Sequence, residues 1–236
     1  MRFDAPLMSF GGVMVDQHGP TDRFPGLAML TGLLANALGY RHSEFNRLQA
    51  LQERIQYAAR WDVEPEHIVD YHTVDLGQEK MHYPGWNTHG GTEHRAGGSG
   101  AKFGTHQRYR HYWANGVMTL AIALDGEGAP NLEELETALR RPARPLFLGR
   151  KTCLPAAPIL LVRVQAANVL DALCGYPAHP RIAENDEETL AACWPAGISG
   201  GVHAYTVSRY DQREWQNQIH AGRRECSVGR IERPTS

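Results

Sequence analysis

The sequence predicts an α+β fold, in which a few helices cover a mainly antiparallel sheet. Several short stretches alternate apolar and polar residues and are rich in aromatic and β-branched side chains, as half-buried strands are. Between them, longer stretches place leucines at helical spacing. In chain order the result is strand, helix, strands, an inserted segment, strand, helix and strand. This order matches the split βαβ, ferredoxin-like arrangement, in which two helices cover one face of the sheet.

The expected strands are bounded by turn residues. In chain order they are residues 2–10, 54–63, 67–76, 116–126, 144–149 and 158–165. We expect the second and third of these strands to pair with each other, because Glu64 and Pro65 between them are typical of a turn. The inserted segment then separates the third strand from the fourth.

The expected helices are marked by their ends as well as by their periodicity. They cover residues 26–39, 43–54, 131–141 and 166–175. Gly39 ends the first helix, since glycine adopts the left-handed conformation that closes a helix. Ser43 and Asn131 are expected to cap the N-termini of the second and third helices.

Beyond residue 155 the pattern is less regular. A short helix is followed by an acidic loop over residues 183–192 and by a β-rich stretch over residues 201–215. We therefore expect a ferredoxin-like domain over residues 1–155 and a small β-rich C-terminal domain over residues 156–236. The last residues, 229–236, are expected to be a frayed tail.

Composition places the chain among ordinary globular proteins, with 236 residues of which 42% are hydrophobic and 21% charged. No stretch approaches the roughly 18 apolar residues of a membrane span, and the N-terminus has no signal-peptide pattern. The four cysteines are far apart and form no Cys-x-x-Cys pair, which argues against a zinc or redox motif. We expect a soluble, cytoplasmic protein with no cofactor and no membrane partner.

Positive charge is concentrated in two segments of a chain whose net charge is only −2. Residues 1–79 carry six basic and eleven acidic groups, whereas residues 80–113 carry five basic and one acidic. Residues 140–151 add five cations and no acid. Two local positive segments indicate a polyanion held at a defined place, because attraction to phosphate falls off within a Debye length. The alternative is that these cations lie singly on a solvated surface.

The inserted segment combines six glycines, four histidines and four cations between His89 and Trp113. The histidine spacing matches no standard zinc finger, and the glycines lack the spacing of a phosphate-binding P-loop. Two hypotheses remain. A metal-independent ribonuclease could use His and Tyr within residues 106–112.

The other hypothesis is a basic arm that holds nucleic acid. Its cations can follow a phosphate backbone and its aromatic rings can stack on bases. The cations are Arg95, Lys102, Arg108 and Arg110, and the rings are those of Trp86, Phe103, Tyr109, Tyr112 and Trp113. The alternative for Tyr109, Tyr112 and Trp113 is that they pack against a strand.

Four separate segments, in this order and spacing, resemble one known family. They are residues 19–40, 48–62, 70–76 and 142–160, which read GPTDRFPGLAMLTGLLANALGY, LQALQERIQYAARWD, DYHTVDL and PARPLFLGRKTCLPAAPIL. They resemble the CasD family, the Cas-five-type subunits of the type I-E CRISPR Cascade complex. The resemblance implies a ferredoxin-like, RRM-like domain with an inserted thumb, here residues 77–110, and a smaller β-rich C-terminal domain.

The resemblance also implies a function. The family binds and caps the five-prime handle of crRNA and contacts the CasC backbone subunits and the large subunit CasA. Target DNA is reached through the whole antiviral complex. Some Cas-five-type proteins of another subtype cleave repeat RNA, but type I-E members resemble a non-catalytic branch. We therefore expect no catalytic and no metal-binding residue, with the ribonuclease kept as the alternative.

The resemblance places two loops on the handle-binding surface, Thr21 to Phe24 and Gly149 to Thr152, and Arg108 at the base of the thumb. With the basic arm, the expected RNA-binding residues are Arg23, Phe24, Arg95, Lys102, Arg108, Arg110, Gly149, Arg150, Lys151 and Thr152. In the alternative interpretation, Arg23 only pairs with Asp22 and Gly149 only turns the chain.

Overall fold

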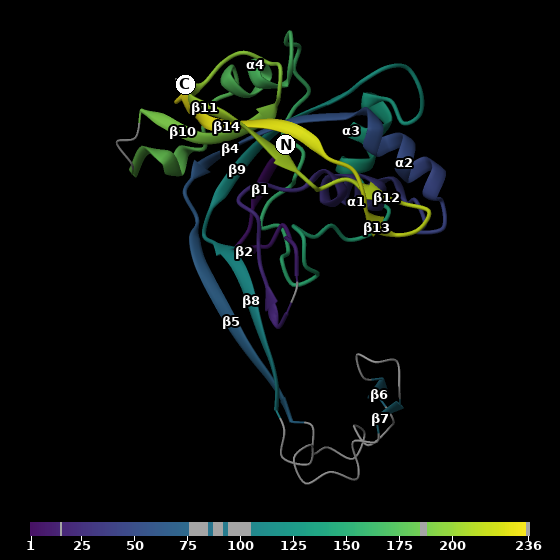
Figure 1. Cartoon of the computed structure of the whole chain (residues 1–236). Helices are drawn as coiled ribbons and strands as arrows, with labels where there is room; N and C mark the ends of the chain where they lie inside the picture. The colour runs from purple at the N-terminus through teal and green to yellow at the C-terminus, as the bar shows by residue number, and fades with distance from the viewer. Residues whose placement is uncertain (15, 76–84, 87–91, 94–104, 185–187, 235–236) are drawn as a thin grey trace.

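The computed structural model describes residues 1–14, 16–75, 85–86, 92–93, 105–184 and 188–234. The chain forms a body of sheet and helices from which a long two-stranded arm projects (Figure 1). The arm consists of β5 (Glu66–Asp75) and β8 (Thr105–Ala114). None of the described helices is long and apolar enough to span a membrane.

A six-stranded sheet runs through the body, and every pair of neighbouring strands in it is antiparallel. Its order is β1 (Arg2–Asp4), β9 (Val117–Leu124), β4 (Ile55–Val63), β10 (Thr189–Pro195), β14 (Arg224–Glu232) and β11 (Val202–Arg209). The α+β class with a mainly antiparallel sheet is confirmed. Strands from both sides of residue 155 share this sheet, and the division into two domains there stays a prediction.

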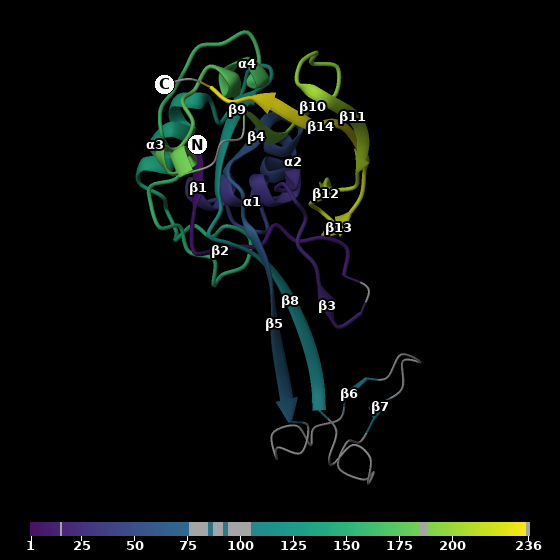
Figure 2. The ribbon, with the colours of Figure 1, turned by 90° about the vertical axis from the view of Figure 1, so that its left-hand side faces the viewer.

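Helices lie on both faces of the sheet (Figures 1 and 2). They are α1 (Leu27–Leu38), α2 (Phe45–Arg54), α3 (Leu132–Arg140), α4 (Val169–Cys174) and a 3-10 turn at Pro180–Glu184. The larger core joins α1, α2 and α3 to one face through residues such as Leu30, Leu51 and Leu120. A smaller core joins α4 to the other face through Leu173 and Trp194.

The predicted helix ends are confirmed in two of three cases. Gly39 ends α1 with φ 79°, and its N–H bonds the carbonyl of Asn36. Asn131 caps α3 in a full capping box, because its side chain accepts from the Glu134 N–H at 2.9 Å and Glu134 accepts from the Asn131 N–H at 2.8 Å. The prediction for Ser43 was wrong: Glu44 occupies the N-cap of α2 and makes no side-chain cap bond.

The expected pairing of residues 54–63 with 67–76 was wrong. Both stretches are strands, but β4 pairs with β9 and β10, whereas β5 pairs with β8. Pro65 lacks an N–H and interrupts the ladder without reversing the chain. The opposite strand bends at the same level, where Asn115 has φ 59° and a Cβ on Gly116 would lie 2.7 Å from Pro65 Cβ. The ribbon of β4 and β9 therefore continues, after a bend, as the arm.

Residues 2–10 form two short strands instead of one. β1 joins the main sheet, and after Pro6 the chain crosses to β2 (Leu7–Met8), which pairs with β8. The short β3 (His18–Gly19) pairs in parallel with β8 on the same edge as β2, the edge that β5 does not occupy, so β2 and β3 brace the base of the arm. Figure 2 shows β3 beside β8.

Other strand predictions fail in the second half of the chain. Residues 144–149 and 158–165 form no regular strand, although Ala156 and Ile159 each make one backbone hydrogen bond to β1. A four-stranded ferredoxin-like sheet therefore stays a prediction. The tail prediction was wrong, because Gly229 to Glu232 lie within β14, which pairs with β10 and β11 on its two sides.

The remaining strands are short hairpins. β12 (Arg213–Glu214) pairs with β13 (Ile219–His220), and β6 (Gly85–Trp86) pairs with β7 (Thr92–Glu93). The latter pair lies within the inserted segment, whose remaining residues are outside the described part of the chain.

A buried ion pair ties the two halves of the chain together. Arg60 in β4 lies 2.6 Å from the Asp62 carboxylate, and both side chains are fully buried. The Arg60 guanidinium also donates to the carbonyls of Leu173 and Tyr176, and Asp62 accepts from the Thr119 hydroxyl at 2.7 Å. Because a buried charge must be fully paired, this network fixes α4 against the sheet.

The variant Asp62→Asn tests this network. It leaves the buried Arg60 charge uncompensated, so we expect the free energy of unfolding to fall by about 3–5 kcal/mol in urea titration. The control Glu136→Gln removes a surface i,i+4 pair between a half-buried Glu136 and an exposed Arg140 and should change stability by less than about 0.5 kcal/mol. Equal effects of the two variants would contradict the assignment.

Candidate nucleic-acid interface

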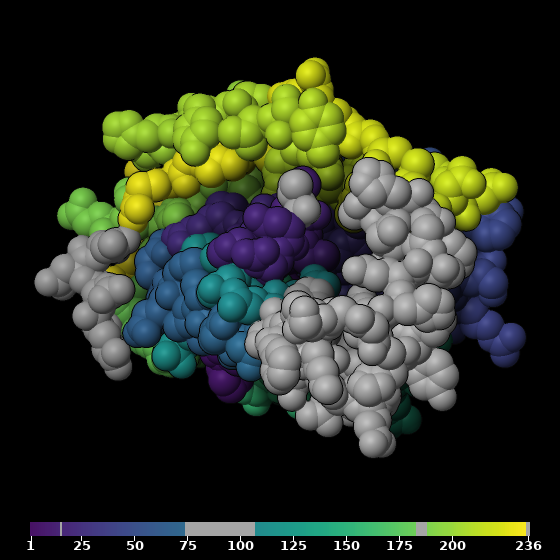
Figure 3. Space-filling model, turned by 60° about the horizontal axis from the view of Figure 1, so that its bottom comes forward, coloured from purple at the N-terminus to yellow at the C-terminus, as the bar shows by residue number. Residues whose placement is uncertain are grey.

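A groove of about 1390 Å³ lies between the N-terminal loop and the C-terminal strands. Its borders are seen in Figure 3, with the N-terminal loop in purple and the C-terminal strands in yellow-green. Residues that line it include Gly12 and Arg23 before α1, Met29 and Gly32 on α1, Arg150, and Tyr205 on β11. The two loops that the sequence analysis placed on one surface, Thr21 to Phe24 and Gly149 to Thr152, thus meet at one groove.

The turn from Leu148 to Cys153 presents its residues in different directions. The Leu148 N–H bonds the Cys153 carbonyl at 2.8 Å, and the Cys153 N–H bonds the Arg150 carbonyl at 2.9 Å. Lys151 and Thr152 are exposed at the tip. Both side chains are accessible to a ligand, and their role as RNA contacts stays a prediction.

Gly149 and Arg150 in the same turn are engaged by the protein itself. Gly149 has φ 96°, and a Cβ there would lie 1.6 Å from the Ser9 carbonyl oxygen. The Arg150 guanidinium donates to the carbonyls of His111 at 3.1 Å and Gly19 at 2.8 Å and lies over the Tyr112 ring. Both residues therefore hold the turn against the base of the arm. The Arg150 guanidinium and the Gly149 backbone, which the sequence analysis proposed as phosphate contacts, are in contact with the protein itself.

Arg23 and Phe24 also differ from each other. Arg23 is half-buried, forms an ion pair with Glu64 rather than Asp22, and lies 5.5 and 5.4 Å from the ring centres of Trp61 and Trp113. Its cation borders the groove. The Phe24 ring is only 3% exposed and packs in the core, so it leaves no surface on which a base could stack.

A second ion-pair network closes the groove at the N-terminus of α1. Gly26 offers no capping side chain, and the Asp211 carboxylate, from the C-terminal segment, accepts from the Leu27 N–H at 3.0 Å. Arg224 donates to both Asp211 oxygens, at 2.8 and 2.7 Å. Burial opposes ionisation of Asp211, but the hydrogen bonds and charge of Arg224 prevail and lower its pKa. Arg209 adds bonds to the Phe24 carbonyl and to Asp22.

Two of the four cations of the predicted basic arm, Arg108 and Arg110, lie on β8. Arg110 is exposed and lies opposite Asp70, whereas Arg108 is half-buried, opposite His72 and 4.0 Å from the Met14 sulfur. Arg95 and Lys102 fall outside the described residues. The structure therefore gives no position for half of the predicted basic arm.

The opposite face of the arm carries a row of aromatic and histidine rings. Tyr109 lies between His18, 4.6 Å away and nearly parallel, and Tyr71, 5.0 Å away. His67 lies 5.0 Å from His111 and 5.2 Å from Trp113. We call these six residues the ring ladder. Of these six, the sequence analysis named only Tyr109 and Trp113 as possible stacking residues. The even spacing of His67 and Tyr71, which puts both on one face of a strand, was the signal for two of the others.

The ribonuclease hypothesis named His106 to Tyr112 as the site. His111 and Tyr112 point to opposite faces of β8, since successive residues of a strand alternate. Tyr112 is buried, and burial together with His67, His18 and Arg150 lowers the pKa of His111. The His106 side chain is outside the described part of the structure. Thus His111 and Tyr112 do not converge on one substrate position.

Over the described residues, no group of three or more His, Cys, Asp or Glu side chains is placed so that it could hold a metal ion. All four cysteines are free, and only Cys174 is exposed. Burial raises the pKa of the Cys193 thiol to about 12. The three buried cysteines therefore act as packing residues in the described structure.

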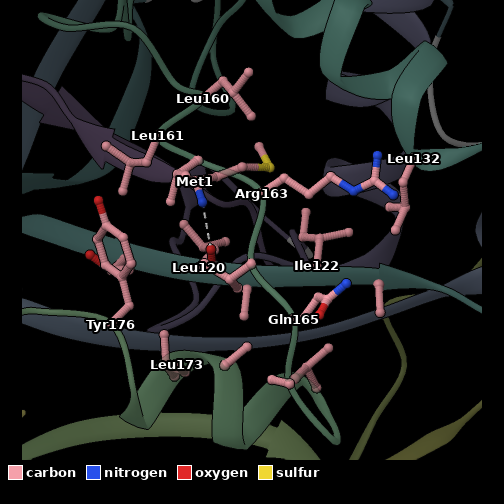
Figure 4. A pocket seen from close by; sticks show the side chains of 18 of the residues that line it. Met1, Leu120, Ile122, Leu132, Leu160, Leu161, Arg163, Gln165, Leu173 and Tyr176 are labelled. Carbon is pink, nitrogen blue, oxygen red and sulfur yellow. Dashed lines mark hydrogen bonds between the residues drawn. The ribbon is translucent and has the colours of Figure 1, made fainter.

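A separate cavity of about 600 Å³ lies between β9, α3 and α4 (Figure 4). Apolar side chains such as Leu120, Ile122 and Leu173 form much of its wall. The Met1 amine donates to the Leu120 carbonyl at 2.7 Å, and burial lowers its pKa to about 5. The charged residues of its lining are Arg163 and Glu136, whereas the groove is lined by four arginines and two aspartates: Arg23, Arg150, Arg209, Arg213, Asp22 and Asp211. Because cations hold phosphates, the groove and the arm are the candidate nucleic-acid interface.

Comparisons with known proteins identify the family. The model of the family described as CRISPR-associated protein (Cas_Cas5) matches residues 1–227. The CRISPR system Cascade subunit CasD of Escherichia coli (strain K12) is 31% identical over 184 residues, which cover 75% of this chain and 75% of that protein. The chain therefore belongs to the Cas5 (CasD) family of CRISPR-associated proteins, and the resemblance found in its sequence is confirmed.

Solved structures share the fold. A chain of a CRISPR RNA-guided surveillance complex has a TM-score of 0.69 and 21% identity, and the match covers 99% of this chain and 90% of that one. A structure described as a Cas protein has a TM-score of 0.62 and 25% identity, with 99% and 97% covered. The whole described fold is thus similar to that of known Cas proteins.

Gly149→Ala tests the close approach of the turn to Ser9. We expect a loss of stability greater than the roughly 1–2 kcal/mol that a positive φ alone costs, because the new Cβ meets the Ser9 carbonyl. The control Gly126→Ala has φ 67° with nothing within 4 Å, so it reports the φ cost alone. Thermal unfolding of both variants measures the difference. Equal losses would show that the contact is unimportant.

Asp211→Asn tests the link between the C-terminal segment and α1. We expect a loss of about 1.5–3 kcal/mol in urea titration at neutral pH, since charged hydrogen bonds are weakened. The folded-state pKa of Asp211 is lowered, so its stabilisation is complete above the ordinary value of 3.8 and is lost as pH falls through the lowered pKa. The difference between wild type and variant should shrink in that range. Asp70→Asn, at an exposed pair with His72, is the control.

Proposed function

We propose that this Cas5-family chain is a non-catalytic, crRNA-binding subunit of a type I-E Cascade complex. It binds the five-prime handle of the crRNA in the groove and caps that end of the RNA. It joins the CasC backbone subunits to the large subunit CasA, so that the assembled complex recognises target DNA. The curated relative is itself named as a Cascade subunit, which supports the assignment.

One observation carries the proposal. Two loops that are about 125 residues apart in the sequence, Thr21 to Phe24 and Gly149 to Thr152, border the same groove. Arg23 and Arg150 bring positive charge to it, and the exposed Lys151 follows Arg150 in the chain. Cations at the border of a groove are suited to the backbone of a single strand, where phosphate contacts fix position and register.

The residues in and next to the groove have two different roles: some contact RNA, and others position the turn. Lys151 and Thr152 are free at the surface and contact phosphate, and Arg23 adds charge from the opposite loop. Arg150 and Gly149 act indirectly, because they hold the turn, and with it Lys151, in a fixed position against His111 and Ser9. This division predicts that RNA affinity depends on Lys151 while the shape of the site depends on Arg150.

The projecting arm is the thumb of the ferredoxin-like, RRM-like domain in this proposal. It extends from the body at the bend beside Pro65, which leaves its two faces open along β5 and β8 (Figure 1). Arg108 and Arg110 face RNA phosphates, as Arg95 and Lys102 do in the rest of residues 77–110. Its far part interlocks with a CasC subunit.

Charge removal in the groove tests RNA binding. Lys151→Ala and Arg23→Ala should weaken binding of a single-stranded RNA that contains the handle. Each lost phosphate contact should reduce the slope of log K against log salt by about 0.7. Fluorescence anisotropy across a salt series gives both quantities. Arg141→Ala is the matched control, because Arg141 is an exposed cation of the same basic segment but lies outside the turn whose Gly149 and Arg150 line the groove.

The second measurement uses the assembled complex. After coexpression with the other Cascade subunits and a repeat-spacer RNA, the handle should resist nuclease. In a variant that combines Lys151→Ala with Arg23→Ala, it should become accessible. If the wild-type subunit left the handle as accessible as a complex without it, the proposal would be wrong. A loss of affinity equal to that of Arg141→Ala would remove the groove as the site.

A further inference from the structure

The ring ladder defined above leaves one side of the arm aromatic. Its members come from three strands: His18 from β3, His67 and Tyr71 from β5, and Tyr109, His111 and Trp113 from β8. Cross-strand neighbours on this face are in register, since Tyr71 lies opposite Tyr109 and His67 opposite Trp113. Alternate residues of paired strands thus place six rings on one surface.

The end of the ladder near the body is explained by packing. Trp113 is half-buried, lies 6.4 Å from Trp61, and donates its indole N–H to the Asp22 carbonyl at 2.7 Å. His67 and His111 share a 3.0 Å contact between ring nitrogens. The Trp113 contacts fix the base of the arm to the body, and the His67–His111 contact joins its two strands.

The outer end is not explained by packing. Tyr71 is 50% exposed, and the neighbouring Val69 is 47% exposed. The Tyr71 ring has Tyr109 on one side, and the Tyr109 ring is already stacked on His18. A row of three rings held at about 5 Å from one another therefore ends in a ring that is half open to solvent.

The ladder face around this end carries little charge. At its positions from 67 to 73 in β5 and from 107 to 113 in β8, every residue is uncharged or histidine, and the first carboxylate in the same alternation is Asp75 at the end of β5. Arg108 and Arg110 occupy the alternate positions of β8, so they lie on the opposite face of the arm. The open aromatic ring therefore offers a base a stacking surface that needs no ion pair.

We propose that the outer ladder, Tyr71 with Tyr109 and His18 behind it, is a stacking site for one unpaired base of single-stranded RNA. The base continues the row of rings on the open side of Tyr71. This site rests on the proposed function, since it assumes that the chain holds a single-stranded RNA, but it is distinct from the groove. It contributes affinity through ring contact with little dependence on base identity.

Tyr71→Ala and Tyr71→Phe test the stacking in the full chain, with the handle-containing RNA as probe. The alanine variant should bind about 5- to 150-fold more weakly, and the phenylalanine variant should retain affinity because the ring remains. His72→Ala is the matched control, since His72 neighbours Tyr71 but points to the other face of the arm. An equal loss in His72→Ala would overturn the proposal.

A series of RNAs with a single abasic position identifies the base. At one position, removal of the base should weaken binding to wild type as much as Tyr71→Ala does, and the two changes together should add no further loss. Additive losses at every position would overturn the stacking site. If wild type bound none of the RNAs, the proposed function itself would fail; if it bound them and protected the handle while Tyr71→Ala bound equally well, only the stacking site would fail.

Discussion

The capping of α1 by Asp211 is the interaction on which the groove depends. A helix with glycine at its N-cap has no side chain there to accept from its first N–H groups. In α1 the Leu27 N–H donates instead to the Asp211 carboxylate, 184 residues away in the sequence. Arg224 lowers the pKa of that carboxylate in spite of burial, so it stays ionised. Arg209, the last residue of β11, donates to the Phe24 carbonyl in the loop before α1. The two walls of the groove are therefore held together by charge at one end.

The Arg60–Asp62 pair performs a similar task on the other face of the sheet. It joins β4 to α4 by way of the Leu173 carbonyl, beside the smaller apolar core that contains Leu173 and Trp194. Buried pairs of this kind contribute specificity more surely than stability, since their desolvation is costly. With both faces fixed, the C-terminal strands extend the main sheet, and the arm leaves from a rigid base at Pro65 and Gly116.

The sequence predicted what short-range rules decide. The ends of α1 and α3 follow from Gly39 and Asn131, and their buried leucines follow from helical spacing. Contacts between residues far apart in the sequence were not predicted, because no local pattern identifies Asp211 as a helix cap or Glu64 as the partner of Arg23. The pairing of β5 with β8 escaped for the same reason, since a proline between two strands suggests a turn whether the ladder reverses or only bends.

The candidate site shows how the same limit applies to function. Residue type and resemblance selected Gly149, Arg150 and Lys151 together, but the fold commits the first two to Ser9 and His111 and leaves Lys151 free. The ring ladder escaped in part because its rings come from three strands. Cations of the groove act through counterion release and lose strength as salt rises, whereas stacking on Tyr71 releases no counterions. RNA held by both surfaces would therefore keep a salt-insensitive share of its affinity, and that share belongs to the arm.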